Sequence, residues 1–217
     1  GLPLGLPELD RITGAVIEQE WVLSRMPGRP PDAHKGTFGT SLLIAGSEEY
    51  PGAAVLAGRS AYRIGSGLVT LAVPPGIYQG LIKTLREATW LVLPEQGGGI
   101  SAEASDLIKG AIHKPTACLI GPGFGTRSGT GKFLEKVFQI GDLPPLVIDA
   151  DGLRLLSGIP NWQKKIPHDC VLTPHPGEMS VLTGLAVEEI QENRVGIAEE
   201  YAQRWKQIVL LKGAHSV

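Results

Sequence analysis

Val171-Leu172-Thr173-Pro174-His175-Pro176-Gly177-Glu178 passes from an apolar run directly into a helix start, and this passage indicates the fold class. The apolar residues predict a short buried strand, and Pro176 suits the first turn of a helix. In open α/β sheets, ligands bind beyond the carboxyl ends of the strands. His175 and Glu178 are three residues apart, so both can face one ligand at this helix start. We interpret the pair as part of a site; the alternative is a structural histidine.

The same alternation of apolar runs and helical stretches continues along the chain. Most of the runs are continuous Val, Ile and Leu, as expected for parallel strands that are covered on both faces. The expected strands are Ser41–Ala45, Leu68–Val73, Trp90–Leu93, Ala117–Ile120, Leu146–Ile148, Val171–Thr173 and Ile208–Leu211. The expected helices are Ala53–Ile64, Ser101–His113, Gly129–Gln139, Pro176–Thr183 and Val187–Lys206. The pattern predicts an α/β fold, a three-layer α/β/α sandwich with a mostly parallel central sheet.

Composition excludes several classes of protein. The 217 residues are 42% hydrophobic and 19% charged, which favours a globular core over disorder. A formal charge of −2 with scattered basic residues gives no footprint for nucleic acid or for an anionic membrane. No apolar run approaches the roughly 18–20 residues that a membrane span needs. We therefore expect neither a nucleic-acid nor a membrane partner.

The two cysteines lie within predicted buried strands. Cys118 and Cys170 are each flanked by apolar residues, so both are expected to behave as small hydrophobic side chains. A disulfide between them is the less favoured alternative. This usage is typical of a reducing compartment, and it predicts a cytoplasmic protein.

The two ends of the chain differ from its middle. Residues 1–33 are rich in Pro and Gly, with one helical candidate at Glu18–Ser24, and are predicted to be a linker. Residues 34–217 are predicted to be one domain. Its last segment, Lys212-Gly213-Ala214-His215-Ser216-Val217, follows the apolar run Ile208–Leu211 directly, where a ligand site is expected. We expect a piece of a longer protein whose domain is incomplete at the C-terminus.

Glycines gather where the predicted strands end. Gly46 and Gly52 flank the loop after the first strand, and Gly121-Pro122-Gly123-Phe124-Gly125 follows the strand ending at Ile120. Such loops allow a ligand to approach backbone amides; tight helix-to-sheet packing is the alternative. The Rossmann fingerprint, the Walker A motif, the nucleophile elbow and a zinc-type ligand spacing are all absent from the sequence.

Two carboxylates close the strand Leu146–Ile148. Asp149 and Asp151 are two residues apart at its carboxyl end, where they can share a Mg²⁺ ion or position a phosphorylated substrate. The alternative for Asp151 is that it caps a helix beginning at Gly152.

Taken together, these motifs resemble the ADP- or ATP-dependent NAD(P)H-hydrate dehydratases, which have a ribokinase-like fold. The matching stretches are His34-Lys35-Gly36-Thr37-Phe38-Gly39, Ile44-Ala45-Gly46-Ser47, Pro51-Gly52-Ala53-Ala54, Gly65-Ser66-Gly67-Leu68-Val69, Gly121-Pro122-Gly123, Asp149-Ala150-Asp151, Leu172 to Glu178, and Leu211-Lys212-Gly213. The resemblance implies a metabolite repair reaction on the S-form of hydrated NADH or NADPH. ADP or ATP phosphorylates the hydroxyl of the hydrate, and elimination of phosphate restores NAD(P)H.

The resemblance also implies roles for individual residues. Ala54, Gly123 and His175 match positions that contact the hydrated nicotinamide nucleotide. The segment Lys212-Gly213-Ala214-His215-Ser216 matches the one that holds the AMP part of the nucleotide donor. Glu178 matches a glutamate that acts on Mg²⁺, and Asp149 is a second metal candidate.

One family feature is absent from the printed residues. The Gly-Thr-Gly-Asp motif, which carries the anion hole and the catalytic base, does not occur in them. We therefore expect no catalytic base in these 217 residues and an inactive chain when it stands alone. A small-molecule kinase of the same fold remains an alternative, although Asn is expected there in place of His175. A non-catalytic nucleotide-binding fragment is the other alternative. The resemblance further implies a homo-oligomer and a possible upstream epimerase domain.

Overall fold

The computed structural model describes residues 16–28, 30–167 and 170–217, which separate into two units, Gly1–Ala33 and His34–Val217. In the first unit, α1 (Gln19–Leu23) forms where a short helix was predicted. Arg25 stacks over the Trp21 ring at 4.0 Å from its centroid. Residues 1–15 of the predicted linker lie outside the described residues.

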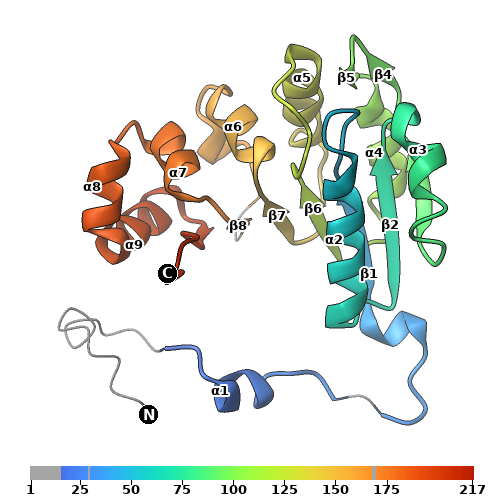
Figure 1. Cartoon of the computed structure of the whole chain (residues 1–217), viewed down its shortest axis with the longest axis horizontal. Helices are drawn as coiled ribbons and strands as arrows, with labels where there is room; N and C mark the ends of the chain where they lie inside the picture. The colour runs from blue at the N-terminus through green and yellow to red at the C-terminus, as the bar shows by residue number, and fades with distance from the viewer. Residues whose placement is uncertain (1–15, 29, 168–169) are drawn as a thin grey trace. The chain divides into compact units, whose positions relative to one another are not determined.

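The second unit is built on a seven-stranded sheet with the order β3-β2-β1-β6-β7-β8-β9 (Figure 1). Every neighbouring pair in it is parallel, so the predicted fold class is confirmed. The strands are β1 (Thr40–Ile44), β2 (Leu68–Val73), β3 (Thr89–Val92), β6 (Ala117–Ile120), β7 (Leu146–Ile148), β8 (Val171–Leu172) and β9 (Ile208–Val209). A separate antiparallel pair joins β4 (Glu95–Gln96) to β5 (Gly99–Ile100).

Helices follow most of the strands. They are α2 (Pro51–Ile64), α3 (Pro75–Leu81), α4 (Ala104–Ala111), α5 (Ser128–Val137), α6 (Asp151–Ser157), α7 (Pro176–Thr183), α8 (Val187–Glu192) and α9 (Arg194–Trp205), with 3₁₀ turns η2 (Lys35–Phe38) and η3 (Trp162–Lys164). The single helix predicted over residues 187–206 is wrong. It is interrupted at Asn193, whose φ of −134° is not helical and whose side chain accepts a hydrogen bond from the Gly196 amide, capping α9.

Alternate residues of the central strands face two separate cores. Leu43 and Ala45 pack with Ala54 of α2 and Ile77 of α3 on one face. Leu42 and Ile44 pack on the other face with residues from helices α4 to α9. This alternation places helices on both faces of the sheet, and it produces the predicted three layers.

Among the described residues, no helix is long and apolar enough to cross a membrane.

The loops that leave the strands converge at the carboxyl edge of the sheet. The Gly46 amide after β1 donates to the Pro122 carbonyl after β6, at 2.8 Å. The Lys212 amide after β9 donates to the Pro174 carbonyl after β8, also at 2.8 Å. These bonds tie neighbouring loops to one another, so residues far apart in the sequence share one edge.

Burial predicts that the Cys118 thiol is chemically protected. Loss of hydration raises its pKa from the ordinary 9.0 to about 12, and the nearby Cys170 adds to the effect. Its thiolate fraction at mildly alkaline pH should therefore be roughly a thousand-fold lower than in the unfolded chain. Mass-spectrometric mapping of alkylation should show slow labelling of Cys118 until guanidinium is added. The pKa of Cys118 is higher in the folded chain than in the unfolded chain. The protonated thiol therefore contributes fully to the stability of the folded state below pH 9, and this contribution is lost as the pH rises through about 12. Equal labelling rates in the folded and unfolded chain would contradict the packing.

Candidate functional site

A lysine ammonium lies between two carboxylates where β7, β8 and β9 end. The Lys212 Nζ atom is 2.5 Å from Asp149 Oδ1 and 3.8 Å from Glu178 Oε2. Asp149 Oδ1 also accepts a hydrogen bond from the Thr173 hydroxyl at 2.8 Å. Lys212 and Asp149 are partly exposed, whereas only 4% of the Glu178 side chain is exposed. The edge of the sheet thus presents a charged, hydrogen-bonded cluster with one face open to a ligand.

His175 and Glu178 form a reciprocal cap at the start of α7. The imidazole Nδ1 accepts hydrogen bonds from the Gly177 and Glu178 amides at 3.0 and 3.3 Å. In return, Glu178 Oε2 accepts one from the His175 amide at 2.9 Å, which completes a capping box. Because Nδ1 is an acceptor, the proton of the neutral ring is on Nε2, 3.2 Å from Glu178 Oε1. Glu178 therefore fixes both the tautomer and the orientation of His175.

The glycine-rich loop after β6 has backbone conformations that residues other than glycine rarely adopt. Gly121, Gly123 and Gly125 have φ values of +118°, +69° and +68°. A Cβ atom on Gly121 would lie 2.2 Å from the Asp149 carbonyl oxygen, so the loop touches the β7 turn directly. A Cβ atom on Gly123 would lie 2.6 Å from that of Ala53, so Gly123 lies against the start of α2. The loop can therefore offer backbone groups to a ligand.

The structure brings the predicted substrate residues to two places on this edge. Ala54 is fully buried in the first turn of α2, next to Gly46. Gly123 lies against the same helix start. His175 belongs to the cluster around Lys212, beyond β7 in the sheet order. These residues thus flank the β7 turn on both sides.

The predicted nucleotide segment is held by an arginine that the sequence did not point to. The Arg194 Nη2 atom, at the start of α9, donates to the carbonyl oxygens of Leu211, Lys212 and His215 at 2.9–3.1 Å. The Ser216 hydroxyl is 3.4 Å from the Gly213 amide. These contacts hold Lys212–Ser216 as a turn. A single arginine after Asn193 carries no recognisable sequence signal, so only the structure could find it.

The alternative that Asp151 caps a helix beginning at Gly152 is wrong. The helix begins at Asp151 itself, and the residue before it, Ala150, caps it with no side-chain bond. The Asp151 carboxylate instead accepts a hydrogen bond from the Gly125 amide, with 2.9 Å between Oδ2 and the nitrogen. Its use is therefore to hold the glycine-rich loop.

The described residues do not by themselves fit a Mg²⁺ ion. No group of three or more His, Cys, Asp or Glu side chains in the described part of the chain is arranged to hold a metal. Asp149 and Glu178 face the Lys212 ammonium, and Glu178 also accepts from the His175 amide. The cation between these carboxylates is thus supplied by the protein.

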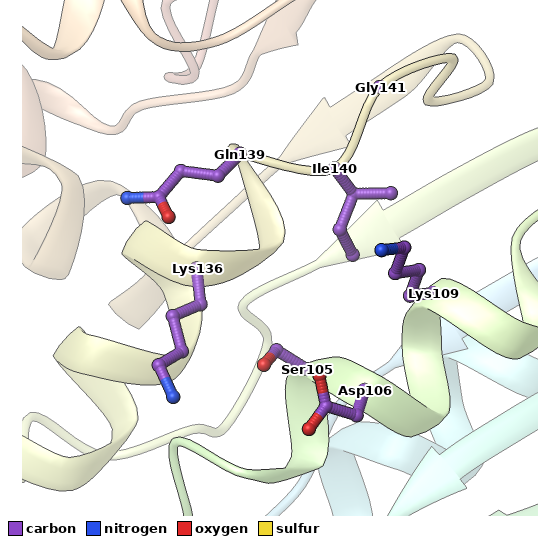
Figure 2. Close-up of a pocket in the computed structure, with 7 residues that line it drawn as sticks. All are labelled: Ser105, Asp106, Lys109, Lys136, Gln139, Ile140 and Gly141. Atoms are coloured by element: carbon purple, nitrogen blue, oxygen red, sulfur yellow. The ribbon is translucent and has the colours of Figure 1, made fainter.

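A surface hollow of about 320 Å³ lies elsewhere, between α4 and α5 (Figure 2). It is lined by Ser105, Asp106, Lys109, Lys136, Gln139, Ile140 and Gly141. None of the predicted site residues is among them, and the two lysines are surface residues of the helices. We therefore place the candidate site at the carboxyl edge of the sheet.

A parallel sheet covered by helices on both faces, with a charged cluster at its carboxyl edge, defines a three-layer α/β protein with a candidate ligand site at that edge. Comparison with known proteins then identifies the family. The profile of the NAD(P)H-hydrate dehydratase family matches residues 41–217. The chain therefore belongs to the NAD(P)H-hydrate dehydratase family.

Individual relatives agree with this assignment. The bifunctional NAD(P)H-hydrate repair enzyme Nnr of Moorella thermoacetica is 34% identical over 218 residues, covering 100% of this chain and 41% of the relative. The ADP-dependent (S)-NAD(P)H-hydrate dehydratase of Bacillus subtilis is 32% identical, covering 92% of this chain and 67% of the relative. A crystal structure of the B. subtilis ADP/ATP-dependent NAD(P)H-hydrate dehydratase, co-crystallised with ATP and Mg²⁺, superposes with a TM-score of 0.73 at 31% identity, over 91% of this chain and 66% of that one. The chain thus spans about two fifths of the length of the bifunctional relatives.

The close contact at Gly121 predicts a strong effect of a single methyl group. Gly121→Ala should lower the free energy of unfolding by roughly 2–5 kcal/mol, because it combines a positive φ with a backbone overlap. Gly131→Ala in α5 is the matched control. Its Cβ would make only ordinary contact with Leu155, so a gain of about 0.5–1 kcal/mol is expected. Denaturant unfolding measures both changes. Similar stabilities for the two variants would contradict the described loop.

Proposed function

We propose that the chain takes part in the dehydration of the S-form of hydrated NADH or NADPH, with ADP or ATP as phosphoryl donor. The observation that carries the proposal is the His175–Glu178 cap beside the Lys212–Asp149 pair, on motifs of the dehydratase family. The name of the B. subtilis relative supports the same chemistry. In this reaction the hydroxyl oxygen of the hydrate forms a bond to phosphorus as the donor's phosphoanhydride bond breaks. Phosphate then leaves with that oxygen while the neighbouring ring carbon loses a proton, and the ring double bond is restored.

On the substrate side, the proposal gives the protein a positioning role. Gly123 and the start of α2 present backbone groups, with Ala54 packed beneath them. His175 presents a ring whose Nε2 atom lies 3.2 Å from Glu178 Oε1 and which is 44% exposed, so it can reach a bound ligand. These residues bind and orient the hydrate.

On the nucleotide side, Lys212 supplies the positive charge that a phosphate group needs. Its ammonium is partly exposed and is held in place by Asp149, while Arg194 shapes the Lys212–Ser216 turn. A fixed cation aimed at transferring phosphate stabilises the charge that builds up in the transition state. We propose that Gly213, Ala214, His215 and Ser216 hold the AMP part of the donor. The base that removes the hydroxyl proton is expected on a Gly-Thr-Gly-Asp motif, which the printed residues do not contain.

Mg²⁺ remains a proposal, supported by the ATP/Mg²⁺ co-crystal of the B. subtilis dehydratase. We propose that any Mg²⁺ arrives with the nucleotide, since this ion keeps water and phosphate ligands rather than an all-protein cage. The geometry gives Glu178 a second use, which is to hold the His175 ring. No step of the reaction is assigned to the metal.

We further propose a cytoplasmic, homo-oligomeric protein, and an epimerase domain upstream of residue 1. The location relies on the two cysteines in apolar surroundings. The upstream domain is supported by the bifunctional relatives, which are longer than this chain.

The proposal is tested by binding and turnover together. The 217-residue chain should bind the product NADPH, measured by its fluorescence, and ADP, measured by calorimetry. It should not regenerate NADH from the S-hydrate, whereas a longer chain that continues through a Gly-Thr-Gly-Asp segment should do so when ADP or ATP is present. Phosphorylation of a vitamin precursor or sugar by the longer chain, without regeneration of NADH, would establish the kinase alternative instead.

Replacement of His175 separates ligand contact from helix capping. His175→Asn keeps a capping oxygen but removes the ring, so it should raise the Kd for NADPH by about 5- to 100-fold, the equivalent of one buried polar contact. ADP affinity should change little. His175→Ala should show the same affinity loss and lose a further ~1 kcal/mol of stability with the cap. An unchanged Kd for NADPH in the Asn variant would remove His175 from the substrate site.

Glu178→Gln distinguishes a metal role from the positioning of His175. A direct metal role predicts that the longer, active chain needs more Mg²⁺ for activity. The geometry instead predicts an unchanged Mg²⁺ requirement and weaker NADPH binding, since the amide cannot hold the ring as a carboxylate does. Titrating Mg²⁺ in the activity assay, alongside NADPH fluorescence, decides between the two. A higher Mg²⁺ requirement with unchanged NADPH binding would instead assign a direct metal role to Glu178.

A further inference from the structure

The residue between the two carboxylates of β7 has an unusual backbone. Ala150 has φ 53° and ψ −125°, a conformation that glycine adopts far more readily than alanine. A non-glycine residue keeps such a conformation only where its surroundings enforce it. Here the Gly152 amide donates to the Asp149 carbonyl at 3.0 Å, and Gly121 leaves no room on the other side. The turn is therefore tightly constrained.

The conformation of Ala150 sends the two carboxylates to opposite neighbours. Asp149 contacts Thr173 and Lys212, on the side of β8 and β9. Asp151 accepts a hydrogen bond from the Gly125 amide, on the side of β6. Two acids separated by one residue thus reach the two sides of the cluster. Neither of them needs a metal for this arrangement.

The glycine-rich loop depends on such a bond. Its three positive-φ glycines allow many backbone conformations, so holding one of them costs entropy. Buried Phe124 anchors the middle of the loop against Phe133, with the ring centroids 6.2 Å apart. The Asp151 carboxylate fixes its end through a charge-assisted hydrogen bond to Gly125. Gly123 directly precedes these two anchors.

We propose that Asp151 is a positioning residue that holds the Gly121–Gly125 loop in the conformation that binds the hydrated nicotinamide nucleotide. The inference rests on the proposed function and deepens it. A loop that is already ordered binds its ligand without a further ordering cost. Asp151 itself touches no reacting atom. It acts through the Gly125 amide, while its neighbour Asp149 orients Lys212 for the nucleotide donor.

The test compares two replacements of Asp151 on the 217-residue chain, with NADPH and ADP as probes. Asp151→Ala removes the acceptor and should raise the Kd for NADPH about 5- to 20-fold, as expected when a hydrogen bond to a charged group is lost. The Kd for ADP should stay within about two-fold. Asp151→Asn keeps an acceptor oxygen and should restore most of the NADPH affinity. Hydrogen exchange at residues 121–125 should accelerate in the Ala variant only.

Asp106→Ala is the matched control, since Asp106 is an exposed acid in the first turn of α4. It removes the same helix-end charge without touching the loop, and NADPH binding should not change. The inference is overturned if Asp151→Ala leaves NADPH binding intact, or if it weakens NADPH and ADP equally, as a general loss of stability would do. Failure of the proposed function gives a different result, because the wild-type chain would then not bind NADPH.

Discussion

The ammonium group of Lys212 connects the parts of the candidate site. It joins the end of β9 to Asp149 at the end of β7 and to Glu178 in α7, two carboxylates that would otherwise repel each other. Glu178 is almost fully buried, so its charge needs such a partner. The ion pair between Arg127 and Glu49 is about half exposed on both sides, and it contributes much less.

The contact between Lys212 and Glu178 also affects the position of His175. Because Glu178 is held by Lys212 on one side, its other oxygen is in place to orient the imidazole ring. The capping box then fixes the ring nitrogen that accepts hydrogen bonds. The histidine that we propose for the substrate side and the lysine that we propose for the nucleotide side are thus linked through one buried carboxylate. Binding on one side can therefore be sensitive to charge on the other.

Much of this arrangement could be predicted from the sequence. The bounds of β2, β6, β7 and α7 agree with the predicted ranges, because continuous apolar runs and a proline at a helix start are local signals. The break at Asn193 was missed because the apolar periodicity continues through it. Helix α3 was not predicted, since its two leading prolines and its glycines resemble a loop.

The tertiary contacts could not be predicted in the same way. Two hydrogen bonds join segments that are distant in sequence: the Gly125 amide donates to Asp151, and Arg194 donates to the Lys212–Ser216 turn. The positive φ of Ala150 has no local sequence signal either. The sequence suggested that Asp151 caps a helix, which would be a local interaction. In the structure its carboxylate instead accepts a hydrogen bond from the Gly125 amide. Local patterns indicated the candidate site residues, whereas only the fold shows which contacts hold them.

The location of the site at the carboxyl edge of the sheet is the central claim, and amide NMR tests it most directly. Spectra of the chain titrated with NADPH and then ADP should show the largest shifts at Gly123, Gly125 and Gly177 for the first ligand. The second ligand should shift Gly213 and its neighbours. The largest shifts at Ser105, Lys109 and Gly141, around the hollow between α4 and α5, would contradict the account.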